Sequence, residues 1–186
     1  AEIARCQAKN GGGWAGSIPE KYFRLIAEGK PTWAPQYVTH KTMMGLLDMY
    51  TRTGNAQALE IIDAFADWFV RWTEPFTREH MDNILDMETG AMIELWADLY
   101  GETGDAKYLT LMNRYRRGRL FDPLLEGRDM LTNVHANSTI PEIHGAARAY
   151  EVTGDEEWRR IVESYWRWAV TERGMFATGG QTSGEI

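Results

Sequence analysis

Two histidines, His40 and His135, and two glutamates, Glu88 and Glu185, are spaced so that they could take part in acid–base chemistry at one site. His135 and Glu185 lie fifty residues apart, and His40 and Glu88 precede them at similar intervals. Carboxylates and amides bind sugar hydroxyls, and a carboxylic acid beside an apolar wall gains the raised pKa with which glycosidases protonate a leaving oxygen. The candidate residues for a sugar-binding and sugar-cleaving site are Trp33, Gln36, His40, Glu88, Thr89, His135, Asn137 and Glu185.

These candidates also have structural alternatives. A histidine near a helix start is often a cap or a satisfied polar residue, so His40 could be structural, and Glu88 could equally cap a helix. His80 is interpreted as structural. Trp14 and Trp33 are the candidates for stacking on a sugar ring, because most other tryptophans lie where a helical core is expected.

A repeated motif shows which elements must position these residues. Tyr-x-x-Thr-Gly-Asn/Asp occurs at 50–55, 100–105 and 150–155. Glycine commonly ends a helix in the left-handed conformation, and Asn or Asp caps the start of the next helix. Since both flanks have helical periodicity, the motif predicts αα-hairpins centred near residues 54, 104 and 154.

The predicted fold is all-α, with serial αα-hairpins forming part of an (α/α)6 toroid. Solenoid linkers are short, whereas the linkers 71–89 and 116–138 are long, and we expect them to be loops. The first helix of each hairpin carries the smaller residues and is predicted to be the inner one. The starts of the inner helices then gather at one rim, which brings the candidate residues together.

Composition restricts the class of protein. A net charge of −7 argues against a nucleic-acid partner. No apolar run approaches the roughly 18 residues of a membrane span. Cys6 is the sole cysteine, so no disulfide can form within the chain. The first ten residues lack a methionine and a signal-peptide pattern, and we expect a start in mid-protein and a cytoplasmic location.

Several stretches resemble the catalytic domain of glycoside hydrolase family 127, the β-L-arabinofuranosidase family. They are YVTHK at 37–41, GLLD at 45–48, TGNAQAL at 53–59, ETGAM at 88–92, ADLY at 97–100, HANSTIP at 135–141, GAAR at 145–148, ATGG at 177–180 and GE at 184–185. The resemblance implies an (α/α)6 barrel that hydrolyses terminal L-arabinose residues with retention. Because six hairpins need roughly twice this length, residues 1–186 are expected to form a partial toroid.

The resemblance also implies roles for individual residues. Glu185 corresponds to the general acid/base, while His40 and His135 correspond to sugar-binding histidines. Some members carry a further histidine near residues 88–92, where this chain has Glu88-Thr89-Gly90, so the sugar could be an arabinofuranoside or an arabinopyranoside. The family's nucleophile is a zinc-bound cysteine downstream of the Gly-Glu pair. We expect that zinc site outside this chain, no metal or cofactor within it, and no activity from these 186 residues alone.

Two other functions are compatible with the residues. Other α/α-toroids act on carbohydrates without zinc, as unsaturated-glucuronyl hydrolases, epimerases or lyases. The chain could also be a non-catalytic helical module that binds glycans or proteins. An open half-toroid would expose Met43, Met44, Leu46 and Leu47, which predicts self-association into a homo-oligomer.

Overall fold

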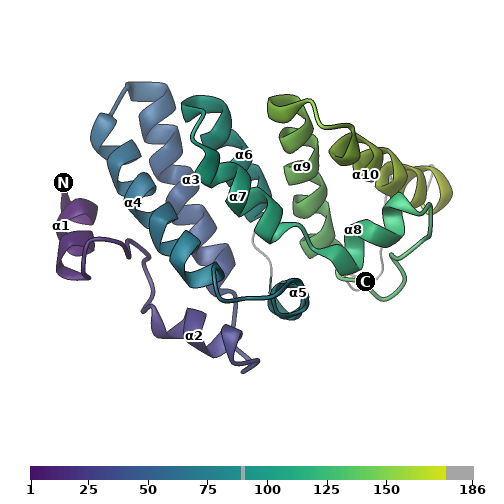
Figure 1. Ribbon diagram of the computed structural model, residues 1–186, viewed down its shortest axis with the longest axis horizontal. Coiled ribbons are helices and arrows are strands. Elements are labelled where there is room, and N and C mark those ends of the chain that lie inside the picture. Colours follow the sequence, from purple (N-terminus) through teal and green to yellow (C-terminus); the bar gives the residue numbers. More distant parts are fainter. Residues whose placement is uncertain (89–90, 175–186) are drawn as a thin grey trace.

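The computed structural model describes residues 1–88 and 91–174 as a chain of helices (Figure 1). The helices are α1 Glu2–Lys9, α2 Lys21–Ala27, α3 Pro35–Thr53, α4 Ala56–Thr73, α5 Arg78–Met87, α6 Met92–Thr103, α7 Ala106–Tyr115, α8 Gly118–Leu125, α9 Ala136–Thr153, α10 Glu156–Trp166 and a π-helical segment, Arg167–Glu172. No strand occurs in these ranges, so the all-α prediction is confirmed. No helix in them is both long and apolar enough to cross a bilayer.

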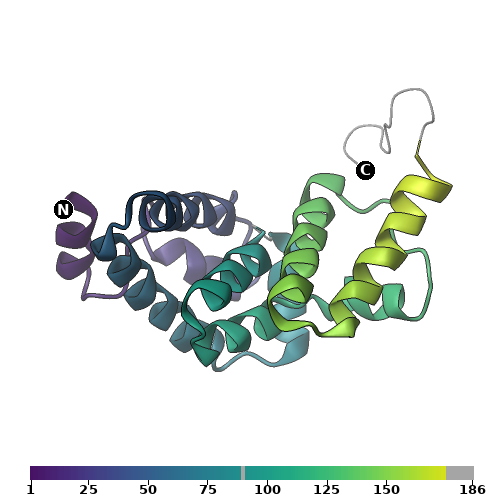
Figure 2. The same cartoon turned by 90° about the horizontal axis from the view of Figure 1, so that it is seen from above.

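Three antiparallel hairpins, α3/α4, α6/α7 and α9/α10, stand side by side in chain order. Their first helices contact one another in sequence, α3 against α6 and α6 against α9. Seen from above, the hairpins follow a curve (Figure 2). This arrangement is that of a toroid segment, and it leaves the starts of α3 and α9 at the same end of the molecule.

The repeated motif builds each hairpin turn. Gly104 has φ of +69°, and its N–H donates to the carbonyl of Tyr100 over 2.8 Å. Asp105 then caps α7 by accepting from the backbone N–H of Lys107 at 2.9 Å. The Thr103 hydroxyl accepts from the Asp105 N–H at 3.2 Å, and Thr153 accepts from the Asp155 N–H over the same distance. The turns at 54 and 154 have the same glycine conformation.

Replacing Gly104 by alanine is expected to lower the free energy of unfolding by about 1–2 kcal/mol, because a Cβ is disfavoured in the left-handed region. The matched control is Gly45→Ala in the middle of α3, where an added Cβ would meet no atom within 4 Å. This control should stabilise by roughly 0.5–1 kcal/mol, since alanine is the better helix former. Urea unfolding measures both changes in the free energy of unfolding. If Gly104→Ala and Gly45→Ala both stabilised or both destabilised the protein, the role assigned to Gly104 would be contradicted.

Close helix packing forms the core. A Cβ on Gly145 of α9 would lie 2.8 Å from the backbone nitrogen of Glu94, so only glycine permits this α6–α9 approach. Met43, Leu46 and Leu47 of α3 are buried, and Met44 is partly buried against the core. The expected exposure of this apolar surface was therefore wrong, because α2, α4 and α6 cover α3.

Both long linkers contain helices, which corrects the prediction that they are loops. Helix α5 begins after Thr77, whose hydroxyl accepts from the His80 N–H at 3.2 Å. It buries Met81, Ile84 and Leu85, an apolar spacing typical of an amphipathic helix. Helix α8 contains Pro123, which argues against a helix in sequence. Helix α5 packs against α2, α7 and α8, and helix α8 also packs against α10.

Candidate functional site

A cavity of about 480 Å³ lies where the inner helices begin. Its walls come from three separate segments: the start of α3, the end of α5 and the start of α9. The lining residues are Trp33, Ala34, Tyr37, Met87, Glu88, His135, Asn137 and Ser138. Hence Trp33, Glu88, His135 and Asn137, four of the sequence-predicted site residues, line one cavity, which we call the rim cavity.

An exposed aromatic surface forms one side of the rim cavity. Trp33 is 87% exposed and Tyr37 is 50% exposed, although folding normally buries such side chains. Lys41 lies with its Nζ 5.0 Å from the centre of the Tyr37 ring. Exposed aromatic faces beside hydrogen-bonding groups suit a sugar ring, whose two faces present C–H groups while its edge presents hydroxyls.

Glu88 caps helix α3 from 52 residues away in sequence. Its two carboxylate oxygens accept from the backbone N–H groups of Gln36, at 2.8 Å, and Tyr37, at 2.9 Å. The Gln36 side-chain amide donates in return to the Glu88 carbonyl. Helix α3 needs this partner because Ala34, in the left-handed conformation at its N-cap, supplies no side-chain cap.

Burial raises the pKa of Glu88, and the bonds from Tyr37 and Gln36 oppose that shift. A carboxylate has about four lone-pair positions, so two remain after capping for hydroxyls of a ligand. Glu88 is therefore both a cap, as the structural alternative held, and a wall of the rim cavity. It can orient a sugar, while its capping bonds hold it in place.

His40 and Gln36 are buried and do not line the rim cavity. His40 is only 3% exposed, and neither ring nitrogen has a hydrogen-bond partner in the part of the chain that the structure describes. The Gln36 Oε1 and Thr39 Oγ1 atoms are also buried without a hydrogen-bond partner among the described residues. Burial lowers the pKa of His40 to about 4, with Lys41 adding a smaller repulsion. His40 is thus a neutral imidazole at pH 7.

The unfolding free energy is expected to fall as the pH drops from 6.5 towards 4, because the unfolded His40 takes up a proton that the folded one refuses. The loss should approach about 3 kcal/mol at full effect. Unfolding of wild type and His40→Gln at pH 7 and at pH 5 isolates this contribution. A difference between the two proteins that does not change with pH would contradict it.

A buried charge network, which the sequence analysis missed, links α5, the start of α8 and α9. Arg117 donates to Glu142 of α9 at 2.6 Å and to Asp86 of α5 at 3.2 Å. Arg117 and Glu142 are 6% and 1% exposed. Asp82 caps α8 by accepting from the Gly118 N–H at 2.9 Å. A charge pattern in sequence gives no sign of this network, because its members are 25 to 36 residues apart.

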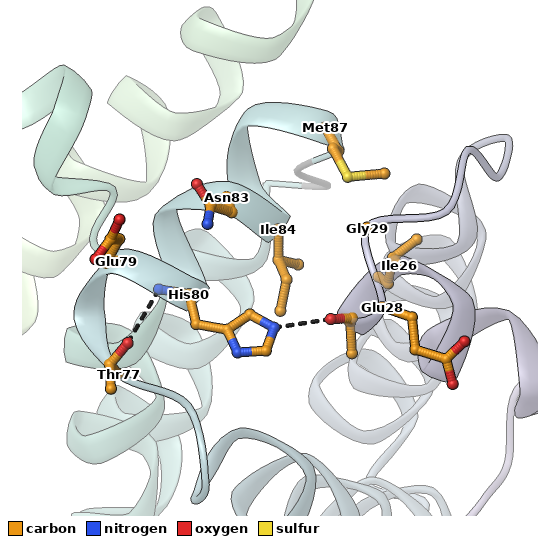
Figure 3. Close-up of a pocket in the computed structure, with 10 residues that line it drawn as sticks. Ile26, Glu28, Gly29, Thr77, Glu79, His80, Asn83, Ile84 and Met87 are labelled. Carbon is orange, nitrogen blue, oxygen red and sulfur yellow. Dashed lines mark hydrogen bonds between the residues drawn. The ribbon is translucent and has the colours of Figure 1, made fainter.

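A neighbouring pocket of about 400 Å³ lies between α2 and α5 (Figure 3). Met87 lines both this pocket and the rim cavity. His80 Nε2 lies 2.8 Å from the Ala27 carbonyl and ties the two helices together, as expected for a structural histidine. Trp14, in contrast, is 3% exposed in an aromatic cluster with Phe23 and Phe65, so the prediction that it stacks on a sugar was wrong.

Two predicted site residues, Thr89 and Glu185, lie outside the described residues. Within the described ranges no group of three or more His, Cys, Asp or Glu side chains could hold a metal ion, and Cys6 is exposed near the start of the chain.

Comparison with known proteins gives the family. No curated protein matches the chain. A family model described as Beta-L-arabinofuranosidase, GH127 catalytic domain, matches residues 1–186. The match spans every hairpin described above and supports a glycoside hydrolase at the level of the family. The resemblance found in the sequence is confirmed, and the chain belongs to the GH127 β-L-arabinofuranosidase family.

Proposed function

We propose that this chain is part of a retaining glycosidase that releases terminal L-arabinose, and that the rim cavity holds the arabinose residue. One observation carries the proposal: Trp33, Glu88 and His135, from three distant segments, line the same cavity in a chain of the GH127 family. Family membership favours this reaction over the toroid epimerases and lyases and over a non-catalytic module.

The chemistry of the rim cavity fits a neutral sugar. Trp33 offers an indole face, Glu88 keeps lone pairs for hydroxyls, and Asn137 can donate and accept. His135 at the start of α9 is exposed to the cavity. The side chains named here would bind and orient the arabinose ring through stacking and hydrogen bonds, without a full charge on the ligand.

Glu185 is proposed as the general acid/base on the strength of the family resemblance. In a retaining glycosidase the protonated carboxylic acid gives its proton to the leaving oxygen, and the resulting carboxylate then takes a proton from the attacking water. The resemblance implies that a zinc-bound cysteine acts as the nucleophile, and this residue is expected outside the present chain.

Replacing Trp33 by alanine tests the binding role of the rim cavity. Trp33 is 87% exposed, so its loss should hardly change stability. Loss of a stacking face should raise KM for an aryl β-L-arabinofuranoside about 3- to 10-fold, with a smaller change in kcat. Trp166→Ala is the matched control, because Trp166 is 62% exposed on the distant helix α10. Equal effects of the two substitutions would argue against a sugar at Trp33.

A further inference from the structure

A second hollow, distinct from the rim cavity, lies between α2, the last turns of α4 and the segment that follows α4. Its volume is about 630 Å³, and we call it the α2/α4 groove. The lining residues are Glu20, Lys21, Arg24, Ala27, Trp68, Arg71, Trp72, Pro75 and Phe76. None of them lines the rim cavity, and the family resemblance assigns no role to this groove.

The wall of the α2/α4 groove is aromatic. The rings of Trp68 and Trp72 are nearly parallel, at 12°, with centres 5.8 Å apart. Phe23, fully buried, supports both rings edge-on at 5.3 and 5.1 Å, and Phe76 packs edge-on against Trp72 at 5.3 Å. These contacts hold the two indole side chains in place. Binding of a flat ligand would therefore cost little conformational entropy of Trp68 and Trp72.

The rim of the groove is cationic in a chain whose net charge is −7. Lys21, Arg24 and Arg71 line it, and all three side chains are exposed. Together with Lys30, Arg24 also interacts with Glu28 outside the groove and helps to lower the pKa of that carboxyl. The single acidic side chain, Glu20, accepts a hydrogen bond from Trp68 Nε1 at 3.0 Å. Three cationic side chains therefore outnumber the one carboxylate in the lining beside an aromatic wall, which favours an anionic ligand with flat apolar faces.

The position of the groove connects it with the rim cavity. Ala27 lines both the α2/α4 groove and the pocket of Figure 3, and Met87 lines both that pocket and the rim cavity. The pocket of Figure 3 thus shares one lining residue with each of the other two hollows and lies between them. A chain-like ligand could occupy the groove while its end reaches the rim cavity.

We propose that the α2/α4 groove binds a uronate-bearing oligosaccharide, with sugar rings on Trp68 and Trp72 and carboxylates facing Lys21, Arg24 and Arg71. A sugar acid combines a ring with apolar faces and a negative charge, the two properties that the groove favours. Sugars are also the ligands expected in a glycosidase family, to which the chain belongs. Together with the proposed function, on which this step rests, the groove would anchor an acidic glycan that carries the terminal arabinose.

Calorimetric titration of the intact protein with a galacturonate hexamer and with its carboxyl-reduced, neutral counterpart tests this inference. The acidic hexamer should bind about ten-fold more tightly than the neutral one. Arg24→Glu/Arg71→Glu should remove this preference and weaken the acidic hexamer by about ten-fold or more. Lys9→Glu/Arg160→Glu is the control, because it changes the net charge equally at exposed sites on α1 and α10. It should change binding by less than about two-fold.

Equal binding of the two hexamers, or no response to the double reversal in the groove, would overturn the proposal. Binding of phosphatidylserine vesicles but not of the acidic hexamer would also overturn it. The same holds if Arg24→Glu/Arg71→Glu changes self-association and the wild-type protein does not bind the hexamer. Arabinoside hydrolysis is measured separately and should be unchanged in the groove variant. A protein that binds the acidic hexamer but releases no arabinose contradicts only the proposed function.

Discussion

Glu185→Gln is expected to lower kcat/KM for an alkyl L-arabinoside by roughly 10²- to 10⁴-fold, the usual contribution of a positioned general acid. Glutamine keeps the size of the side chain but cannot give a proton to the leaving oxygen. Sugar binding should persist, because the rim cavity is lined by other residues. The rates are measured by release of L-arabinose from the intact protein.

The leaving group separates an acid role from a structural one. An aryl arabinoside whose phenol is strongly acidic departs without protonation, so Glu185→Gln should reduce its kcat/KM far less than that of an alkyl arabinoside. Glu172→Gln serves as the matched control, since Glu172 pairs with Arg167 at the surface. The same large loss for both leaving groups would contradict the acid role.

Above about pH 8, where Glu142 is ionised in the folded protein, Arg117→Ala is expected to lower the free energy of unfolding by about 3–5 kcal/mol, because it leaves the buried Glu142 carboxylate without its cationic partner. Burial already raises the pKa of Glu142 to about 8, and loss of the guanidinium would raise it further. The folded variant can escape part of the cost by protonating Glu142. The destabilisation measured by urea unfolding should therefore grow as the pH increases.

Two controls identify the cause. Arg119→Ala removes a neighbouring arginine that pairs with Asp86 at 2.6 Å but is far more exposed than Arg117, so it should cost much less stability than Arg117→Ala. Arg117→Met/Glu142→Leu replaces both charges by apolar groups and should recover most of the lost stability. A double variant as unstable as Arg117→Ala would show that packing, and not the unpaired charge, determines the loss.

The sequence was most informative where one residue type has one structural consequence. Gly54, Gly104 and Gly154 end three helices in the left-handed conformation, and the following Asn or Asp starts the next helix, so the hairpins could be predicted. Because the first helices of these hairpins were predicted to start at one rim, Trp33, Glu88, His135 and Asn137 could be placed together, and they line one cavity.

Contacts between distant segments were harder to predict. Glu88 caps α3 and not its own helix, because the start of α3 happens to lie against the end of α5. The pair of Arg117 and Glu142 depends on how α8 meets α9, and the placement of Trp14 depends on its fit against Phe65. Such contacts follow from tertiary packing, which a local pattern does not specify.

A crystal structure of the Glu185→Gln protein with a bound β-L-arabinofuranosyl disaccharide would test the central claim most directly. The account predicts the terminal arabinose in the rim cavity, stacked on Trp33 and hydrogen-bonded to Glu88 or Asn137. Arabinose bound at another site, or a rim cavity that stays free of sugar at saturating disaccharide, would contradict it.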